Sequence, residues 1–295
     1  MPGPGYGPYH LEACAGCGHV VTRPEPREGE LTALYGEAYY GPDHRRFVGP
    51  LELATSGFRR WRARDIARRR PPGTFLDIGC GSGLLAASVA RHGWRVMGTE
   101  LSDESARHAR EALGVPVVTG EFQTLELPPA SVDVVTMWQT FEHMREPNAV
   151  LKRVHEVLRP GGWLIVSVPN RQSWQARFAG PRWFHLDVPR HLHHYGEATL
   201  RRMLEAARFR VDRVSHFNWE QNPFGWLQSM IDVASGTQNS LFDVIRATAS
   251  SAGARRWAAI AALVASPVLV PVALGLALAE SLARRGGTIT VWASK

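Results

Sequence analysis

Lysine is almost absent from this chain of 295 residues, which contains only Lys152 and Lys295. The formal net charge of +7 therefore comes from arginine, and a GC-rich genome explains that bias as well as an anionic ligand does. Cysteine is also scarce, and three cysteines cannot build a disulfide framework, so a reducing cytoplasm is expected. The start of the chain lacks the basic-then-apolar order of a signal peptide.

Glycine, in contrast, is concentrated in one short stretch, FLDIGCGSGL at 75–84. Apolar strand residues lead into it and a helical pattern follows, so it predicts a strand, a tight turn and a helix N-terminus that cradle a nucleotide-like cofactor. A dinucleotide fingerprint requires glycine at the position of Leu84, which disfavours an NAD-dependent oxidoreductase. A glycine-rich turn that binds no ligand is the other alternative at this point.

Strands and helices alternate from 74 to 170. The strands are short, continuous apolar runs, as expected when both faces of a parallel sheet are covered. Ligands of such sheets lie at the carboxyl ends of the strands. The expected strands are 74–78, 94–100, 115–119, 131–138 and 162–168, and the expected helices are 82–92, 103–113 and 147–159.

An acidic residue, Glu100, ends the second expected strand, 21 residues after Gly79. A carboxylate at this place can accept both hydroxyl groups of a ribose. Glu100 therefore supports a nucleoside cofactor without separating a dinucleotide from S-adenosylmethionine.

The stretch 132–170 contains a D-V-V strand, the pair Glu142-His143, a helix that closes in L-R-P-G-G, and a strand that ends in P-N. With the glycine stretch, these motifs resemble class I S-adenosylmethionine-dependent methyltransferases of the ubiquinone-biosynthesis O-methyltransferase type, over roughly 74–215. The resemblance implies an α/β fold with a doubly wound, Rossmann-like, seven-stranded and mostly parallel sheet. It also implies methyl transfer with S-adenosylmethionine as cofactor.

The same resemblance assigns the cofactor-binding residues. Those in the glycine turn are Asp77, Gly79, Cys80, Gly81 and Gly83. Those at the ends of the following strands are Glu100, Leu101, Glu121, Phe122, Trp138 and Gln139. Some relatives bind a divalent metal through E-x-x-E-H, but Gln139 stands at the first position here, so no metal is expected.

Three residues are candidates for the base that takes a proton from the acceptor. His143 follows the fourth strand of the core and has an ordinary pKa near working pH, although it can equally serve only to orient the site. The second region, 171–195, resembles the W-x-x-D-x-P-R-H segment of methyltransferases that are tied to envelope or lipid substrates. It offers His191 or Asp187 as the base, or a salt-bridged lid without chemistry.

The N-terminal segment contains Cys14-x-x-Cys17-Gly18, which is half of a structural zinc site. It resembles methyltransferases with an N-terminal zinc ribbon, whose later parts Pro24-Glu-Pro26 and LYGEAYYG at 34–41 match. The first cysteine pair is missing, so either His10 and His19 substitute for it or the turn carries free thiols.

Arginines crowd the helical pattern at 51–70, which Pro71, Pro72 and Gly73 terminate. Such a run is usually a solvated face, and its alternative role is attraction to anionic lipid or a phosphorylated substrate. Nucleic acid is not expected as a partner, because Trp61 alone interleaves the arginines.

A hydrophobic insertion separates the expected helix at 200–209 and strand at 210–217 from the closing antiparallel strand at 286–295. Its segment 258–279 has 22 residues without a charge, enough to cross a membrane as one helix. A single crossing would remove the last strand from the sheet, and both flanks are basic. Because prolines lie mid-stretch, a helical hairpin that docks on a membrane is expected, with a buried helical pair or a dimer surface as the alternative.

The sequence thus predicts four segments: an N-terminal segment with a partial zinc knuckle, a methyltransferase core, a hydrophobic helical insertion and a closing strand. These are 1–50, 51–218, 219–285 and 286–295. The expected function is O-methylation of a hydroxyl on a lipid-linked or amphipathic acceptor, in the cytoplasm or on the inner face of its membrane. The alternative is a catalytically silent module that binds S-adenosylmethionine or a partner at the membrane. The oligomeric state stays open.

Overall fold

The computed structural model describes residues 7–27, 30, 50–239, 241–242 and 253–295. The chain divides into two compact units, each assembled from separated segments. The cofactor unit takes 49–168, 200–214 and 291–295, and the accessory unit takes 1–48, 169–199 and 215–290. These units cut across the segments expected from the sequence, because 169–199 groups with the N-terminal and C-terminal parts of the chain.

The expected seven-stranded sheet is confirmed, in the order β5-β4-β3-β6-β7-β10-β9. The pairs β3–β4, β4–β5, β3–β6 and β6–β7 are parallel. The strands are β3 (Thr74–Ile78), β4 (Arg95–Glu100), β5 (Val117–Thr119), β6 (Val132–Trp138), β7 (Leu158–Pro169), β9 (Arg210–Ser215) and β10 (Thr288–Ser294). The carboxyl ends of β3, β4 and β6 lie side by side, since Asp77 is in register with Gly98 and with Thr136.

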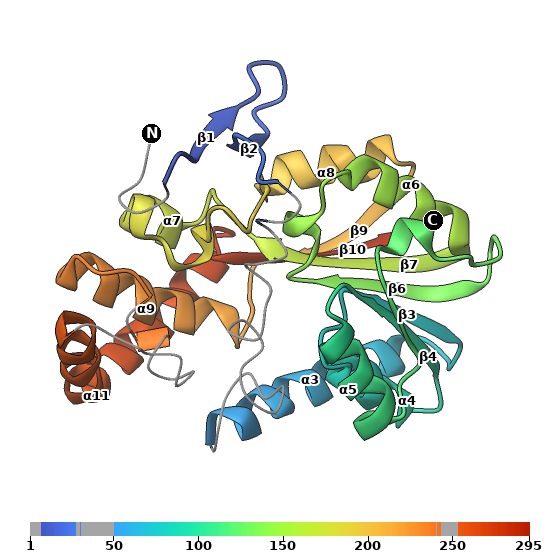
Figure 1. The fold of residues 1–295 in the computed structure, drawn as a ribbon, viewed down its shortest axis with the longest axis horizontal. Helices are drawn as coiled ribbons and strands as arrows, with labels where there is room; N and C mark the ends of the chain where they lie inside the picture. Colours follow the sequence, from blue (N-terminus) through green and yellow to red (C-terminus); the bar gives the residue numbers. More distant parts are fainter. Residues whose placement is uncertain (1–6, 28–29, 31–49, 240, 243–252) are drawn as a thin grey trace. The chain divides into compact units, whose positions relative to one another are not determined.

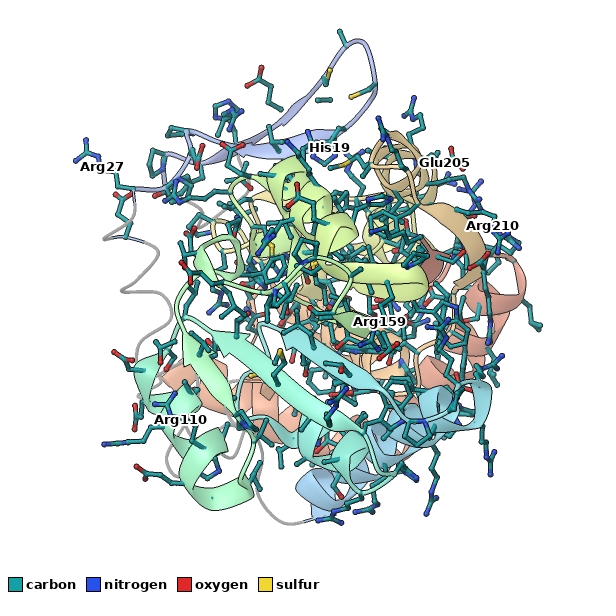
Figure 2. All side chains as sticks on the ribbon, turned by 90° about the vertical axis from the view of Figure 1, so that its right-hand side faces the viewer. His19, Arg27, Arg110, Arg159, Glu205 and Arg210 are labelled. Carbon is teal, nitrogen blue, oxygen red and sulfur yellow. The ribbon has the colours of Figure 1, made fainter. Side chains whose placement is uncertain are left out.

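Helices cover both faces of this sheet, with α3, α4 and α5 on one side and α6 and α8 on the other (Figure 1). They are α3 (Pro50–Arg69), α4 (Leu84–Ala90), α5 (Asp103–Leu113), α6 (Pro147–Val157) and α8 (Glu197–Ala206). The ends of α5 follow from its sequence. Ser102 caps its first turn by accepting a bond from Ser105 N, and Gly114 ends it in a left-handed conformation with φ of 65°. Arg110, on the outer side of α5, donates to Val117 O (Figure 2).

The arginine-rich helix α3 does more than face solvent. Arg62 is only 8% exposed, and its guanidinium carbon lies 4.1 Å from the ring centroid of Trp138. Near the end of the helix, Arg70 covers Trp163 at 4.6 Å. These stacked guanidinium groups attach α3 to the aromatic side chains of the sheet.

The accessory unit contains a small sheet that the sequence did not predict. Strands β1 (His10–Ala13), β2 (Val20–Arg23) and β8 (His193–His194) form it in the order β1-β2-β8. The segment LYGEAYYG at 34–41, which resembles part of methyltransferases with an N-terminal zinc ribbon, lies outside the described residues.

Cys14 and Cys17 lie in the turn between β1 and β2, and both are exposed. His10 pairs with Arg23 at the other end of the hairpin, about 13 Å along the strand from Cys14. His19, labelled in Figure 2, shares a 2.9 Å hydrogen bond with His193. His10 thus lies far from the two thiols and His19 pairs with His193, and in the described part of the chain no third ligand joins the thiols.

The hydrophobic insertion contributes α9 (Gln221–Ser235) and α11 (Gly253–Leu282), which pack on each other and, through α9, on α7 (Trp174–Ala179). The expected hairpin bend at the prolines is wrong, because α11 continues through Pro267 and Pro271. Both prolines are exposed, so their rings and the carbonyls they release meet no packed neighbour on that side. Within the described residues, no helix has the length and apolar character needed to span a membrane.

Candidate functional site

The glycine turn between β3 and α4 adopts a backbone that side chains would resist. Gly79, Gly81 and Gly83 have φ values of 68°, 53° and 74°. The turn is tied to the neighbouring strand, since Gly79 N and Cys80 N both donate to Thr99 O, at 2.8 and 3.0 Å. A Cβ at Gly79 would collide with the side chain of Thr140, whereas the space beside Gly81 is open. The turn therefore presents backbone at close range to a ligand over Gly81.

Glu100 closes this turn from the end of β4. Its side chain is 6% exposed, and one carboxylate oxygen accepts from Gly81 N at 2.9 Å while the other accepts from Ser102 N at 3.0 Å. A carboxylate can accept several hydrogen bonds, and the two hydroxyl groups of a ribose are donors that such a carboxylate can bind.

Asp77 is a buried carboxyl at the centre of the site. Burial raises the pKa of Asp77 to about 7, and the charge of Glu100 acts in the same direction. The hydrogen bond from Thr136 Oγ1, at 2.6 Å, and the positive charge of Arg62 oppose this rise. A cationic ligand beside Asp77 would favour its ionised form.

Cys80 is a packing residue rather than a nucleophile. Burial raises the pKa of its thiol, and the carboxylates of Asp77 and Glu100 raise it further, so the thiol stays protonated. Its sulfur would stand 2.6 Å from a Cβ at Gly98, which explains why the neighbouring strand has a glycine there.

Arg62 is a site residue that the sequence interpretation missed. It comes from α3, lies over Trp138 and is close enough to Asp77 to lower the pKa of that carboxyl. In the sequence it is one of seven arginines between 59 and 70. Its neighbours Ala63 and Ile66 are both buried, but α3 has no periodic apolar pattern that would separate Arg62 from the other arginines.

The cofactor residues that the resemblance places after the second and third strands of the core differ in exposure. Leu101 is 63% exposed, whereas Phe122, in the short helix η2 (Phe122–Thr124), is only 2% exposed. Glu121 is exposed and precedes that helix. Leu101 is thus the residue of this group that offers an open apolar surface.

The end of β6 supplies the last part of the site. Gln139 follows with φ of 53° and donates from its backbone N to Ser167 O at 2.8 Å. The indole N–H of Trp138 is buried and meets no acceptor in the described part of the chain. In the short helix η3 (Phe141–His143), Glu142 is 1% exposed and His143 half-buried. The open glycine turn, the carboxylate at the strand end and this unpaired donor fit S-adenosylmethionine.

The remaining candidates, Asp187 and His191, belong to the accessory unit. Arg190 Nε lies 3.0 Å from both carboxylate oxygens of Asp187, so this carboxylate is held in an ion pair. His191 Nδ1 lies 3.0 Å from His185 O. Because a carbonyl can only accept, Nδ1 carries a proton, so the neutral form of His191 has an unprotonated Nε2, as a base requires. Nε2 lies 3.8 Å from Asp187 Oδ2.

The strand order, the glycine turn and the carboxylate at the end of β4 together define a class I methyltransferase fold that binds S-adenosylmethionine. The chain belongs to the methyltransferase-domain family, because the model of that family, described as "Methyltransferase domain", matches residues 51–214. S-adenosylmethionine is the cofactor of this family.

Two curated relatives carry the name ubiquinone biosynthesis O-methyltransferase. The protein from Albidiferax ferrireducens is 33% identical over 131 residues, 41% of this chain and 52% of the relative. The protein from Chromobacterium violaceum is 31% identical over 171 residues, 53% of this chain and 72% of the relative. The chain thus spans about half the length of the first relative.

A solved S-adenosylmethionine-dependent methyltransferase from Archaeoglobus fulgidus has a similar fold. Its TM-score is 0.52 at 19% identity, and the match covers 85% of this chain and 97% of that one.

Proposed function

We propose that this chain transfers a methyl group from S-adenosylmethionine to a hydroxyl oxygen of an amphipathic, lipid-linked acceptor. The observation that carries the cofactor part is Glu100, a buried carboxylate held by Gly81 N and Ser102 N beside an open glycine turn. The name of the two curated relatives supports oxygen as the methylated atom.

The chemistry asks mainly for positioning. Bound S-adenosylmethionine would supply a methyl group already activated by the positive charge of its sulfonium. Glu100 would hold the ribose, and the buried pair of Asp77 and Arg62 would take the charged amino and carboxylate ends of the methionine part. A neighbouring base must then accept the proton of the acceptor hydroxyl.

His143 is our first choice for that base. It lies in the cofactor unit, in the short helix η3 that follows β6 after a connection of two residues. His191 is the second choice, supported by the tautomer that its bond to His185 O imposes. Asp187 is the weakest of the three candidates, because Arg190 already neutralises it.

Exposed aromatic side chains of the accessory unit support an amphipathic acceptor. Its segment 169–199 exposes Trp174 at 38% and Phe178 at 51%. Aromatic surface of this kind suits an apolar chain attached to a polar ring or sugar. Such an acceptor would be reached from the cytoplasmic side of a membrane.

The test is incubation of the purified chain with methyl-labelled S-adenosylmethionine and a bacterial lipid extract. We expect S-adenosylhomocysteine to form and the label to enter the organic phase as an ether that resists mild base. Glu100→Gln should bind the cofactor roughly 10–100-fold more weakly by calorimetry, because one charged hydrogen-bond partner is lost. Glu111→Gln, on the exposed side of α5, is the matched control and should bind normally.

Comparison of variants identifies the base. If His143 is the base, His143→Gln should lower turnover by roughly 100-fold or more with unchanged cofactor affinity. If the accessory unit supplies the base instead, His191→Gln should show that loss of turnover. Cofactor binding without turnover on any extract would favour the silent binding module instead. Absence of cofactor binding would refute the proposal as a whole.

A further inference from the structure

Helix α11 exposes apolar side chains where an ordinary surface helix exposes polar ones. Six of its large apolar side chains between 268 and 282 are exposed by 37% to 86%. They are Val268, Val270, Val272, Leu274, Leu278 and Leu282. No charged side chain accompanies them on the outward side of this stretch. In a water-soluble helix the outward side is the polar one.

The inward side carries the charge. Glu280 is fully buried and accepts hydrogen bonds from Gln175 Nε2 at 2.7 Å and from Gly287 N at 2.9 Å. Beside it, Ala273 and Ala277 pack against Trp226 of α9. The small alanines let the two helices approach closely, so the larger apolar residues of α11 are left on the outside.

The width of the outward side indicates what covers it. At 100° per residue, the exposed positions from Val270 through Leu278 to Val272 span about 200° of the helix circumference. A single partner helix would cover an apolar stripe of roughly 100°. A lipid phase, which surrounds a helix on every free side, covers the whole arc.

Basic and aromatic side chains border the carboxyl-terminal end of α11, where Trp174 N of α7 donates to Arg285 O at 3.1 Å. On α7, Trp174, Arg177 and Phe178 are exposed and one helical turn apart, and the Phe178 ring lies 5.6 Å from that of Trp226, the α9 residue beneath α11. Arg285 is exposed just after the end of α11. The described side chains of α7 and α11 include no exposed carboxylate, so the border is complementary to an anionic surface.

We propose that α7 and the described part of α11 form a docking surface for an anionic bilayer. The apolar arc of α11 enters the boundary between acyl chains and headgroups, the aromatic rings lie at headgroup level, and the arginines contact lipid phosphates. The docking needs no cofactor or turnover. It would place the enzyme where an acceptor with a lipid chain is found. It shares Trp174 and Phe178 with the proposed acceptor contact, but its test measures vesicle binding and not methyl transfer.

The test is flotation of the full chain with vesicles, because bound protein rises with them through a density gradient. We expect binding to vesicles of phosphatidylglycerol and phosphatidylcholine, and at least tenfold weaker binding to phosphatidylcholine alone or in 0.5 M salt. The double variant Leu274→Gln/Leu278→Gln should reduce binding on the order of 100-fold, since two apolar anchors are lost. Both positions are exposed, so the fold should be kept, which circular dichroism checks.

Trp61→Gln is the matched control, because Trp61 is 57% exposed on the arginine-rich helix α3. It should leave vesicle binding unchanged. Loss of binding in this variant, with normal binding by the double variant, would move the docking to α3 and overturn the proposal. A dimer by light scattering that only the double variant dissociates, with no vesicle binding in either protein, would show a second copy as the occupant and overturn it as well.

Discussion

Arg62 is a guanidinium that folding places out of water, which requires compensation. The face of Trp138 at 4.1 Å and the neighbouring carboxyl of Asp77 both contribute to that compensation. A carboxylate ligand is the partner that a planar, bidentate donor fits best, which is why we assign Arg62 to the methionine part of the cofactor.

Arg62→Met should therefore weaken binding of S-adenosylmethionine by roughly 10–100-fold, the loss of one charged, partly buried hydrogen-bonded pair. Isothermal titration calorimetry measures this. Arg64→Met removes an exposed arginine from the same helix and should leave the affinity unchanged. Equal affinities of the two variants would show that Arg62 only supports α3 against the sheet.

At the scale of single elements, the turn between β3 and α4 depends on two different demands on glycine. One is conformational, because φ is positive at all three glycines. The other is spatial, because the side chain of Thr140 occupies the place of a Cβ at Gly79. Only the second demand links the turn to the segment after β6, where Gln139 and His143 lie.

Gly79→Ala and Gly114→Ala separate these demands. Gly114 also has a positive φ, of 65°, but open space beside it, so its variant should lose about 1 kcal/mol of stability and bind cofactor normally. Gly79→Ala has to displace the turn or Thr140, and should lose more than roughly 100-fold in cofactor affinity. Thermal unfolding and calorimetry on both variants check this, and normal affinity in Gly79→Ala would contradict the assigned role of the turn.

At the scale of the whole molecule, buried carboxyls make the stability of the chain depend on pH. Burial raises the pKa of Glu280 to about 7, against the hydrogen bonds from Gly287 N and Gln175. The folded state thus holds a proton that the unfolded state releases above about 4.5. This contribution is fully present below pH 4.5 and is lost as the pH rises to about 7.

We therefore expect Glu280→Gln to have a flatter stability profile than the parent chain. The parent should lose up to about 3 kcal/mol between pH 4.5 and 7 through this group, because one pKa unit corresponds to about 1.4 kcal/mol. Urea unfolding at a series of pH values measures the difference. Glu25→Gln, an exposed carboxylate, should reproduce the parent profile, and an equally steep profile in Glu280→Gln would contradict the assignment.

Much of the cofactor unit could be predicted because its signals are local. The expected helix at 103–113 is α5 residue for residue, since a capping serine and a glycine mark its two ends. The sheet of β1, β2 and β8 could not be predicted. Its strands have four, four and two residues, too few for a periodic pattern, and Val20 pairs with His194 across most of the chain.

The amino-acid sequence alone determined a site for a nucleoside cofactor, because the acidic residue, the glycines and Glu100 follow a fixed spacing along one strand, one turn and the next strand. The resemblance of the wider motifs to a known family then narrowed that cofactor to S-adenosylmethionine. Only the tertiary structure decided which arginine enters the site and which way the hydrophobic insertion faces. The packing of α3 on Trp138 distinguishes Arg62 from the neighbouring arginines. The packing of the small residues Ala273 and Ala277 on Trp226 decides which side of α11 faces outward. Burial is a property of contacts between distant segments, so composition and periodicity along one helix do not specify it.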